Sequence, residues 1–464
     1  MRYSFVTGML ASGWLMLATG FGASAQEQAI DRYIRVAMDS NIVVQQKNIS
    51  LDKALLSLKT AKSLYAPSVS FLAGYQSGDG GRNISLPLGD LLNNAYATLN
   101  QLTGSQQFPQ LENQSVNFFP RNFYDAKIRT TLPIVNPDIG YGRQISAYQA
   151  QLQEYELAAY KRELVKEVRV AYYNHLQALH AVAIHESARQ LALEGKRVNE
   201  RLLERGKGLP AYILRSESEI AVIDARLVQA NQEVENSRLY FNMLLNRPAD
   251  AAIDTSFDED QAMRAHLPEI PDTRGMEKRE ELQSLSTFVQ INETVLKMNK
   301  GFRIPRLSGF LDLGAQSEGM KYTRQSRYYM AGLQMEIPLF SASRNTNKIR
   351  ESELNIRDAR LGLEKLSQQL ALSSRVAQNN LNAAWKSYQA SLTQLQGAEA
   401  YQRLIERGYQ AGTHTYIETV DARNQLTAAR LAVILGKFQV LQAAALLERE
   451  TASYSINPKN ADNE

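Results

Sequence analysis

The sequence predicts a mainly α-helical fold with a membrane β segment, built from two copies of one strand-strand-long-helix-hairpin unit. Three observations predict it: long stretches without proline in which apolar residues recur at helical spacing, short segments in which apolar and polar residues alternate, and a motif that recurs about 200 residues later. The 464-residue chain contains no cysteine, which excludes disulfides and thiolate metal sites.

The first 25 residues have the composition of a secretory signal peptide. One early positive charge, Arg2, precedes an apolar run that ends in Ala23-Ser24-Ala25, the small-x-small pattern of a signal-peptidase site. A single membrane anchor is the alternative, but glycine and hydroxyl residues interrupt the run and no stop-transfer charges follow it. Cleavage removes only Arg2 and lowers the formal net charge from +4 to +3, which does not favour nucleic acid as a partner.

After Ala25 we find no segment that resembles the ~20-residue apolar stretch of a membrane-spanning helix. The mature chain is therefore expected to be either soluble in the periplasm or a β-barrel protein, because barrel strands carry only a weak alternating signal that average hydropathy misses.

A repeated motif indicates that the chain is a duplication. The hexapeptide Arg201–Gly206 recurs as Arg403–Gly408 with five of six residues identical, and Tyr212-Ile213 recurs as Tyr416-Ile417. The offset between the copies grows from 202 to 204, so the second copy has two extra residues between these landmarks. A period this long is not that of a solenoid. The predicted divisions are a signal peptide at 1–25, a first repeat at 26–247, a connector at 248–274, a second repeat at 275–452 and a polar tail at 453–464.

Each repeat is predicted to contain an initial helix, two strands and two long helices. No proline occurs between Gly142 and Arg205, and a helix of that length would be on the order of 95 Å long. Such a length indicates coiled-coil-like packing. Pro210 suits the first turn of the next helix. The long helices are predicted at residues 142–205, 210–246, 343–407 and 414–450, and the acidic, proline-containing connector is expected to be irregular.

Four short segments alternate with a period of two, as strands between lipid and a wet lumen do. They are predicted at residues 67–76, 123–133, 305–315 and 327–338. A proline, which cannot donate to a strand ladder, is expected to close each of them: Pro67, Pro133, Pro305 and Pro338. A soluble four-stranded sheet is the alternative. Four strands are too few to close a barrel, so a membrane location requires several copies to share one. The side chains predicted to face the lumen are Asp125, Lys127, Arg129, Asp312, Gln334 and Glu336.

Several motifs occur in the order found in one known family. They are Ala61–Val69 before the first strand, Leu132–Ile134 and Ile337–Leu339 at two strand exits, Leu239–Pro248 at a helix end, and Gly408–Ala422 at the last hairpin. With the duplication, they make essentially the whole mature chain resemble the TolC family of outer-membrane channel-tunnels. The resemblance implies a homotrimer that forms a 12-stranded β-barrel continued by a periplasmic α-helical barrel. It also implies contact with outer-membrane lipid, a periplasmic adaptor protein and an inner-membrane transporter.

The chain departs from the family pattern in two places. The family often has Asn-Pro early in its first helix, whereas Asn41 is followed by Ile42. The first strand pair also encloses a longer loop, with 66 positions from Pro67 to Pro133 against 33 from Pro305 to Pro338. We expect the leucine-rich insertion to form a short helix in an extracellular loop, and we hypothesise that it narrows the outer mouth.

The resemblance places a periplasmic gate at the tips of the helical hairpins, with Tyr409, His414, Glu418, Asp421 and Glu217 as its candidates. His414, Glu418 and Asp421 follow Gly412 at i, i+4 and i+7 and are predicted to form one helical stripe. In a trimer, Glu418 and Asp421 would place six carboxylates around the opening, and acid rings favour cations. The family positions matching Tyr409 and His414 tie neighbouring hairpins together. Histidine there, in place of the family's frequent arginine, implies a pH-sensitive tie.

Two features leave undecided which residues pair with the gate candidates. Leu214 lies where the family can offer an acid, while Glu217 aligns with Asp421. Thr415 and Glu418 also have the spacing of a helix N-terminal capping box, which is the structural alternative for Glu418.

The sequence favours a transport role and not an enzyme. His175, His180 and His185 do not share a helix face, and the glycines near Gly80 lack the lysine of a phosphate loop, so no metal or cofactor is expected. The leading function is an outer-membrane exit duct of a tripartite efflux system. The alternatives are the outer-membrane component of type I protein secretion and, in another class, a periplasmic coiled-coil adaptor or scaffold.

Overall fold

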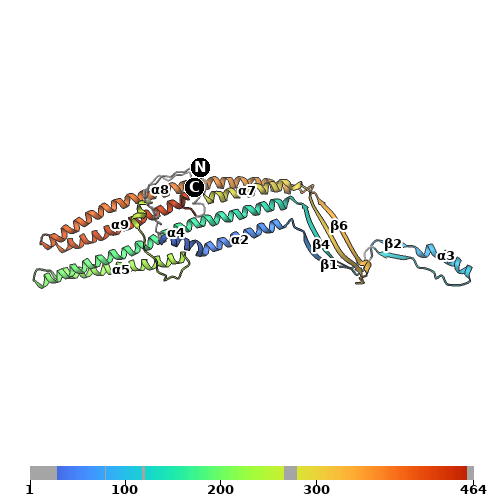
Figure 1. The fold of residues 1–464 in the computed structure, drawn as a ribbon, viewed down its shortest axis with the longest axis horizontal. Coiled ribbons are helices and arrows are strands. Elements are labelled where there is room, and N and C mark those ends of the chain that lie inside the picture. The colour runs from blue at the N-terminus through green and yellow to red at the C-terminus, as the bar shows by residue number, and fades with distance from the viewer. Residues whose placement is uncertain (1–28, 79, 118–120, 266–278, 457–464) are drawn as a thin grey trace, which may run out of the picture. The chain divides into compact units, whose positions relative to one another are not determined.

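The computed structural model describes residues 29–78, 80–117, 121–265 and 279–456, so the predicted signal peptide and most of the polar tail lie outside the described residues. Within these ranges the chain is mainly helical, with one four-stranded and one two-stranded sheet (Figure 1). The chain divides into two compact units. We call them the helical unit, Met1–Gln45, Tyr160–Glu277 and Leu370–Glu464, and the strand unit, Gln46–Ala159 and Lys278–Gln369.

The strand unit contains an antiparallel sheet made from both repeats. Its strand order is β1-β4-β5-β6, so β1 and β6 form its edges. Strands β4 and β5 come from different repeats, and their pairing therefore joins the two copies of the duplicated unit. The four strands are β1 (Ser68–Gln76), β4 (Phe123–Val135), β5 (Arg306–Glu318) and β6 (Arg327–Glu336).

Pro133 lies inside β4 and not at its end, so the prediction that it closes this strand was wrong. The register between β4 and β5 shifts between Pro133 and Val135, which marks a β-bulge. A bulge tolerates proline because the ladder of hydrogen bonds is interrupted there. Pro67 and Pro305 directly precede β1 and β5, and Pro338 follows the last residue of β6 by two positions.

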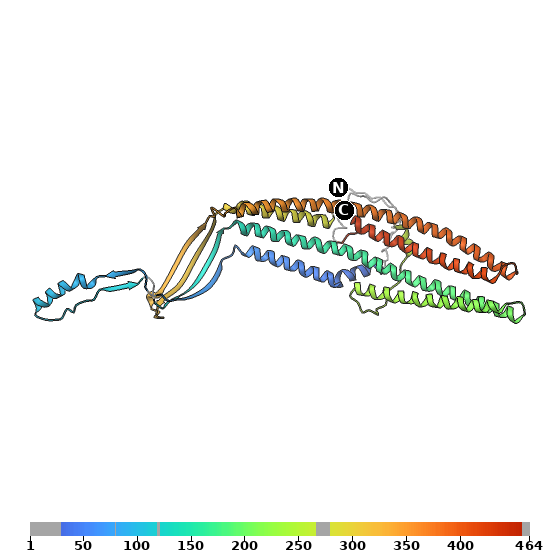
Figure 2. The same ribbon diagram turned by 180° about the vertical axis from the view of Figure 1, so that it is seen from behind.

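An arm connects the end of β1 to the start of β4. Within it, strand β2 (Asn83–Leu86) pairs with strand β3 (Gln114–Asn117), and helix α3 (Leu88–Thr103) lies between them in the sequence (Figure 2). The leucine-rich insertion thus contains a short helix, as expected. The strand pair that precedes and follows this helix was not predicted.

The long helices pair as two antiparallel hairpins, α4 with α5 and α8 with α9 (Figure 1). α4 begins at Pro137, where the missing N–H of proline costs no helical hydrogen bond, and not at Gly142 as predicted. The Asn136 side chain accepts a hydrogen bond from the Asp138 N–H at 3.1 Å and so caps the N-terminus of α4. The long helices are α4 (Pro137–Glu204), α5 (Pro210–Leu244), α8 (Arg344–Gln410) and α9 (Tyr416–Thr451).

The initial helix of the first repeat is two helices with Asn41 between them. Asn41 Oδ1 accepts hydrogen bonds from the N–H groups of Val43 at 2.9 Å and Val44 at 3.2 Å, so it caps the second helix without a proline. The connector contains a short helix and is not wholly irregular, and its residues from 266 onward lie outside the described residues. The shorter helices are α1 (Ala29–Ser40), α2 (Ile42–Ser63), α6 (Glu259–Ala265) and α7 (Glu280–Lys300).

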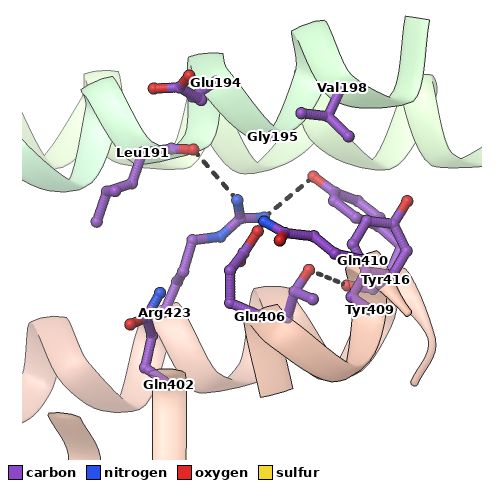
Figure 3. Close-up of a pocket in the computed structure, with 11 residues that line it drawn as sticks. Leu191, Glu194, Gly195, Val198, Gln402, Glu406, Tyr409, Gln410, Tyr416 and Arg423 are labelled. Carbon is purple, nitrogen blue, oxygen red and sulfur yellow. Dashed lines mark hydrogen bonds between the residues drawn. The ribbon is translucent and has the colours of Figure 1, made fainter. Parts of the chain in front are cut away.

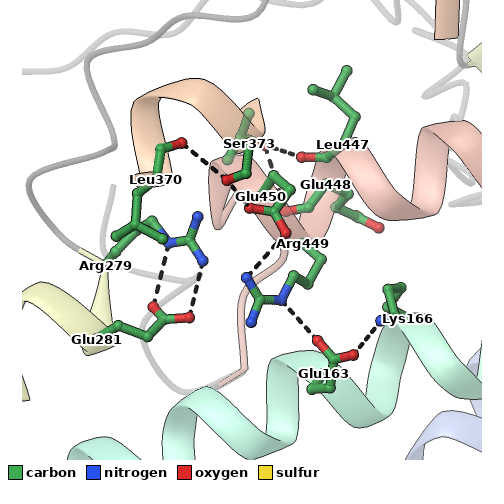
Figure 4. A network of polar contacts seen from close by, with 11 residues as sticks. Glu163, Lys166, Arg279, Glu281, Leu370, Ser373, Leu447, Glu448, Arg449 and Glu450 are labelled. Atoms are coloured by element: carbon green, nitrogen blue, oxygen red, sulfur yellow. Dashed lines mark hydrogen bonds and ion pairs between the residues drawn. The ribbon is translucent and has the colours of Figure 1, made fainter. Parts of the chain in front are cut away.

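Polar contacts fix the C-terminal end of α9 to α4 and α8 within the helical unit (Figure 4). Arg449 Nε donates to Glu163 at 2.8 Å, and Glu163 also pairs with Lys166. On α8, the Ser373 hydroxyl donates to Glu450 at 2.6 Å. Buried aromatic side chains pack in the same unit, among them Tyr172, Phe241 and Phe438. The Arg449–Glu163 contact therefore joins the two hairpins far from their tips.

Among the described residues, α9 is the one helix long and apolar enough to span a membrane by length and composition. By this test of length and composition, the expectation that no such segment follows Ala25 was wrong. Leu426, Phe438 and Leu441 on this helix are buried inside the helical unit. Because a packed helix needs an apolar face of this kind, composition alone does not indicate a membrane span.

Candidate functional site

The hairpin tips collect all five gate candidates, and both tips lie in the helical unit. Each first helix ends in a hydrogen-bonded turn around a glycine with positive φ, which relieves the strain that a side chain would meet there. Gly206 has φ of +70° and Gly412 has φ of +77°. The N–H groups of Gly206 and Lys207 bond to carbonyls of α4, and those of Gly412 and Thr413 bond to carbonyls of α8.

The start of α9 contains a complete capping box. The Thr415 side chain accepts from the Glu418 N–H, and Glu418 Oε2 accepts from the Thr415 N–H at 2.6 Å. This backbone hydrogen bond holds the pKa of the Glu418 carboxyl below its ordinary value, with a further contribution from the Thr415 hydroxyl. His414 Nδ1 lies 3.3 Å from Glu418 Oε2, but His414 precedes α9, so the two do not form the helical stripe that was expected.

Asp421 and Glu217 remain on the outside of their helices. Asp421 is exposed and accepts a hydrogen bond from the Gln425 amide at 2.7 Å. Glu217 is also exposed and pairs with Lys196 of α4 at 2.8 Å. The acids predicted to line an aperture are thus free of the buried core, and their role in a gate remains a prediction.

Tyr409 lies in a buried chain of hydrogen bonds that joins the two hairpins. Its hydroxyl donates to Asn199 Oδ1 on α4 at 2.7 Å, and Asn199 Nδ2 donates to the Ser216 hydroxyl at 3.1 Å. Ser216 in turn lies 2.8 Å from the Tyr416 hydroxyl. Burial raises the pKa of Tyr409 above its ordinary value, which favours the protonated hydroxyl.

An ion pair between Arg423 of α9 and Glu219 of α5 completes this arrangement. The atoms Arg423 Nη2 and Glu219 Oε2 are 3.3 Å apart, and the side chains are only 8% and 5% exposed. Arg423 also donates to the Leu191 carbonyl of α4 at 3.1 Å and to the Tyr416 hydroxyl at 3.2 Å (Figure 3). Burial raises the pKa of Glu219, although the charge of Arg423 acts in the opposite direction.

A glycine makes room for the Arg423 guanidinium. A Cβ atom on Gly195 of α4 would lie 2.4 Å from Arg423 Nη1, closer than real atoms pack. In Figure 3 the guanidinium lies directly beneath the ribbon at this glycine. A cavity of ≈ 280 Å³ adjoins it, lined among others by Glu194, Glu406 and Gln402. We call Asn199, Ser216, Glu219, Tyr409, Tyr416 and Arg423 the cross-hairpin network.

The sequence reasoning identified Tyr409 but missed the other members of the cross-hairpin network. One signal was available: at the offset of 204 that relates Tyr212 to Tyr416, Glu219 aligns with Arg423. Opposite charges at equivalent positions of a duplicated chain can pair when the copies pack side by side. The rings of Tyr212 and Tyr416 are themselves 5.5 Å apart, so equivalent residues do meet here.

The sheet of the strand unit has one polar and one apolar face. Its register places Asp125, Lys127 and Arg129 of β4 opposite Gln316, Gly314 and Asp312 of β5, with Gln334 and Glu336 of β6 on the same face. Arg129 forms two parallel hydrogen bonds to Asp312, at 2.7 and 2.6 Å. Lys127 pairs with Asp125 at 2.9 Å, and the Tyr328 hydroxyl donates to Asp125 at 2.8 Å.

The opposite face carries the apolar set of all four strands. Phe71 of β1, Ile128 of β4 and Leu313 of β5 are register neighbours on it, and Tyr329 of β6 follows. These four side chains are between 48% and 78% exposed in the single chain. A sheet with an uncovered apolar face of this width needs an apolar environment or a partner.

Known proteins with related sequences and folds are outer-membrane channels. A family model described as outer membrane efflux protein matches residues 298–452. The chain is 24% identical over 304 residues to the cobalt-zinc-cadmium resistance protein CzcC of Cupriavidus metallidurans, covering 64% of this chain and 70% of CzcC. It is 24% identical over 126 residues to the outer membrane protein TolC of Salmonella enteritidis, only 26% of either chain.

Solved structures extend the likeness to the entire chain. The Campylobacter jejuni CmeC outer membrane channel has the same fold with a TM-score of 0.74 and 12% identity, covering 100% of this chain and 96% of that one. The predictions of a channel protein and not an enzyme, and of an outer-membrane location, agree with these relatives. The expected resemblance to the TolC family is confirmed: the outer membrane efflux protein model matches residues 298–452, and the fold is similar to that of a known outer-membrane channel over the length of the chain.

Proposed function

We propose that the protein is the outer-membrane exit duct of a tripartite efflux system, and that three copies share one 12-stranded barrel. The sheet carries this proposal, because its register gathers the charged side chains of both repeats on one face and the apolar side chains on the other. Such a sheet fits a wall between lipid and a water-filled lumen. Its edge strands β1 and β6 would then pair between copies, which removes the open edges.

Purified protein in detergent tests this proposal. We expect a trimer that survives SDS without heating and dissociates on boiling, and stepwise currents when the protein is added to planar lipid bilayers. A monomer that stays soluble without detergent and carries no current would support the periplasmic scaffold and overturn the duct.

The hairpin tips are the proposed periplasmic gate. In a trimer Glu418 and Asp421 would contribute six exposed carboxylates near the opening, where they would attract and retain cations. The cross-hairpin network, which includes Tyr409, would hold the two hairpins of each copy together. The double substitution Glu418→Ala and Asp421→Ala is expected to raise the conductance and to weaken block by divalent cations. Unchanged current and unchanged block would remove these acids from the gate.

Divalent transition metals are the first cargo to test. The longest curated match, CzcC, is named for cobalt, zinc and cadmium resistance. A duct does not need its own metal site. In the part of the chain that the structure describes, no group of three or more His, Cys, Asp or Glu side chains is arranged to hold a metal ion. We expect a deletion strain to lose growth on cobalt, zinc or cadmium salts and to regain it on complementation. Normal growth on all three would exclude this cargo.

A further inference from the structure

The arm between β1 and β4 is held together by hydrogen bonds among its own residues. On α3, the side-chain amides of Asn93 and Asn100 each bind the backbone of one residue in the returning chain. The amide oxygen accepts a hydrogen bond from the backbone N–H of that residue, and the amide nitrogen donates one to its carbonyl. Asn93 pairs in this way with Leu111, at 2.7 and 3.0 Å, and Asn100 with Phe108, at 3.0 and 2.8 Å. The Asn113 side chain accepts from the first turn of α3. All of these bonds lie within the arm, and they fix the returning chain against α3.

A different face of α3 is apolar and uncovered. Its residues follow each other at intervals of four, three, four and three, the spacing of a coiled-coil seam. They are Leu88, Leu92, Ala95, Leu99 and Leu102, and all of them are exposed, up to 78% for Leu102. The asparagines that bind the returning chain lie about 130° around the helix from this seam, at about 100° per residue. The seam is therefore free to pack against another helix.

The chemistry of the arm selects a second copy as the partner. From Asn83 to Asn117 the sequence contains no lysine, arginine or histidine, so the arm lacks the cations with which surface helices hold anionic lipid headgroups. Asp90 is the one charged residue of α3 and lies away from the seam, so identical helices would not repel each other there. A self-matching leucine seam, on a helix whose one charge lies away from the seam, fits copies of itself best.

Connectivity brings the arms of different copies together. The arm leaves the end of β1 and re-enters the start of β4, which is the strand end opposite the long helices α2 and α4. In a shared barrel, three arms would rise from the same rim. We propose that the three α3 helices pack in parallel through this seam and narrow the outer mouth of the duct; this inference rests on the trimeric barrel proposed above.

Two alanines of α3 provide a matched test. Ala95 lies on the seam and Ala97 lies about 180° from it, and both are exposed. The chain has no cysteine, so Ala95→Cys and Ala97→Cys each introduce a single thiol per copy. Treated in outer-membrane vesicles with a mild oxidant, the Ala95→Cys protein is expected to give a disulfide-linked dimer band on a boiled, non-reducing gel. The Ala97→Cys protein is expected to give several-fold less of it.

Two outcomes would overturn the inference, and they differ. If both cysteine variants form the heat-sensitive trimer but cross-link equally weakly, the seam does not join copies, while the duct stands. If the parent protein forms no trimer, the proposed function fails and this inference fails with it. Leu99→Lys provides a second measurement: it places three like charges on the seam, and we expect a larger single-channel conductance than with Gln101→Lys on the opposite side. Equal conductance would show that the seam does not narrow the mouth.

Discussion

The two hairpin tips come from one repeated motif but have different chemistry. α4 ends at Glu204 inside the motif, whereas α8 continues past the equivalent Glu406 to Gln410, which adds about one turn. α9 then starts with a full capping box, while the cap residue of α5, Leu209, makes no side-chain hydrogen bond. The second copy thus holds four of the five gate candidates, and one of these, Tyr409, donates a hydrogen bond to Asn199 of the first copy.

The clearest difference between the copies lies at one pair of equivalent positions. Glu219 and Arg423 occupy the same place in the repeat, yet their opposite charges allow them to pair across the hairpins. Gly195 on α4 leaves the space that the guanidinium fills. The two copies of the repeat are therefore complementary in charge at this position.

Breaking the buried ion pair should have the largest effect. Glu219→Ala leaves the buried Arg423 without its carboxylate, a change that costs about 3–5 kcal/mol in comparable sites. We expect a clear fall in the melting temperature of the purified protein and a larger channel current. Glu235→Ala on the same helix is the control, because its pair with Arg238 is half-exposed and should change neither quantity. Equal effects of the two variants would mean that the pair does not join the hairpins.

Filling the space beside Arg423 should have the next largest effect. Gly195→Ala forces the guanidinium to move, and overpacking of this kind typically costs about 1–3 kcal/mol. Gly397→Ala on α8 meets no atom within 4 Å, so there the higher helix propensity of alanine should raise the melting temperature slightly. If both alanine substitutions raise the melting temperature, the absence of a side chain at Gly195 is not needed to accommodate the Arg423 guanidinium.

The cap of α9 should contribute less. Thr415→Ala removes the side chain that caps the helix, and loss of such a cap costs about 1 kcal/mol. Leu209→Ala alters the N-cap residue of α5, which makes no side-chain cap hydrogen bond, and should leave the melting temperature unchanged. Thermal unfolding followed by circular dichroism compares the two. A larger loss from the leucine variant would reverse the proposed difference between the tips.

The smallest effect concerns pH. The pKa of Glu418 is depressed below its ordinary 4.5, so the contribution of its ionised form is present above that value and is lost as the pH falls through the lower, folded-state pKa. The melting-temperature difference between the parent and Glu418→Gln should therefore stay constant from pH 8 to about pH 5 and shrink only in stronger acid. A difference that already vanishes near pH 6 would contradict the capping role of Glu418.

Much of the fold was predictable because it follows from local pattern. Helical spacing without proline identified the long helices, and alternation identified the strands and their polar face, as the register of Arg129 with Asp312 illustrates. Pro133 was misplaced because a bulge is decided by pairing with β5, which the strand's own sequence does not reveal. The pairing of β2 with β3 also depends on residues 28 to 34 positions apart and had no local signal.

The candidate site was less predictable because it depends on contacts between helices distant in sequence. Tyr409 could be found through the family resemblance, but its contact with Asn199 spans 210 positions. The helical stripe proposed for His414 failed because the turn after Gly412 keeps this residue outside α9. Only the comparison of repeats at an offset of 204 would have pointed to Glu219 and Arg423.

Single-channel recording of the Glu219→Ala protein tests the central claim most directly, namely that the protein is a duct whose hairpins the cross-hairpin network holds together. The parent protein should give stable, small-amplitude currents in a planar bilayer, and Glu219→Ala should give larger ones while Glu235→Ala matches the parent. Identical currents from all three proteins would contradict the role of the network, and no current from any of them would contradict the duct itself.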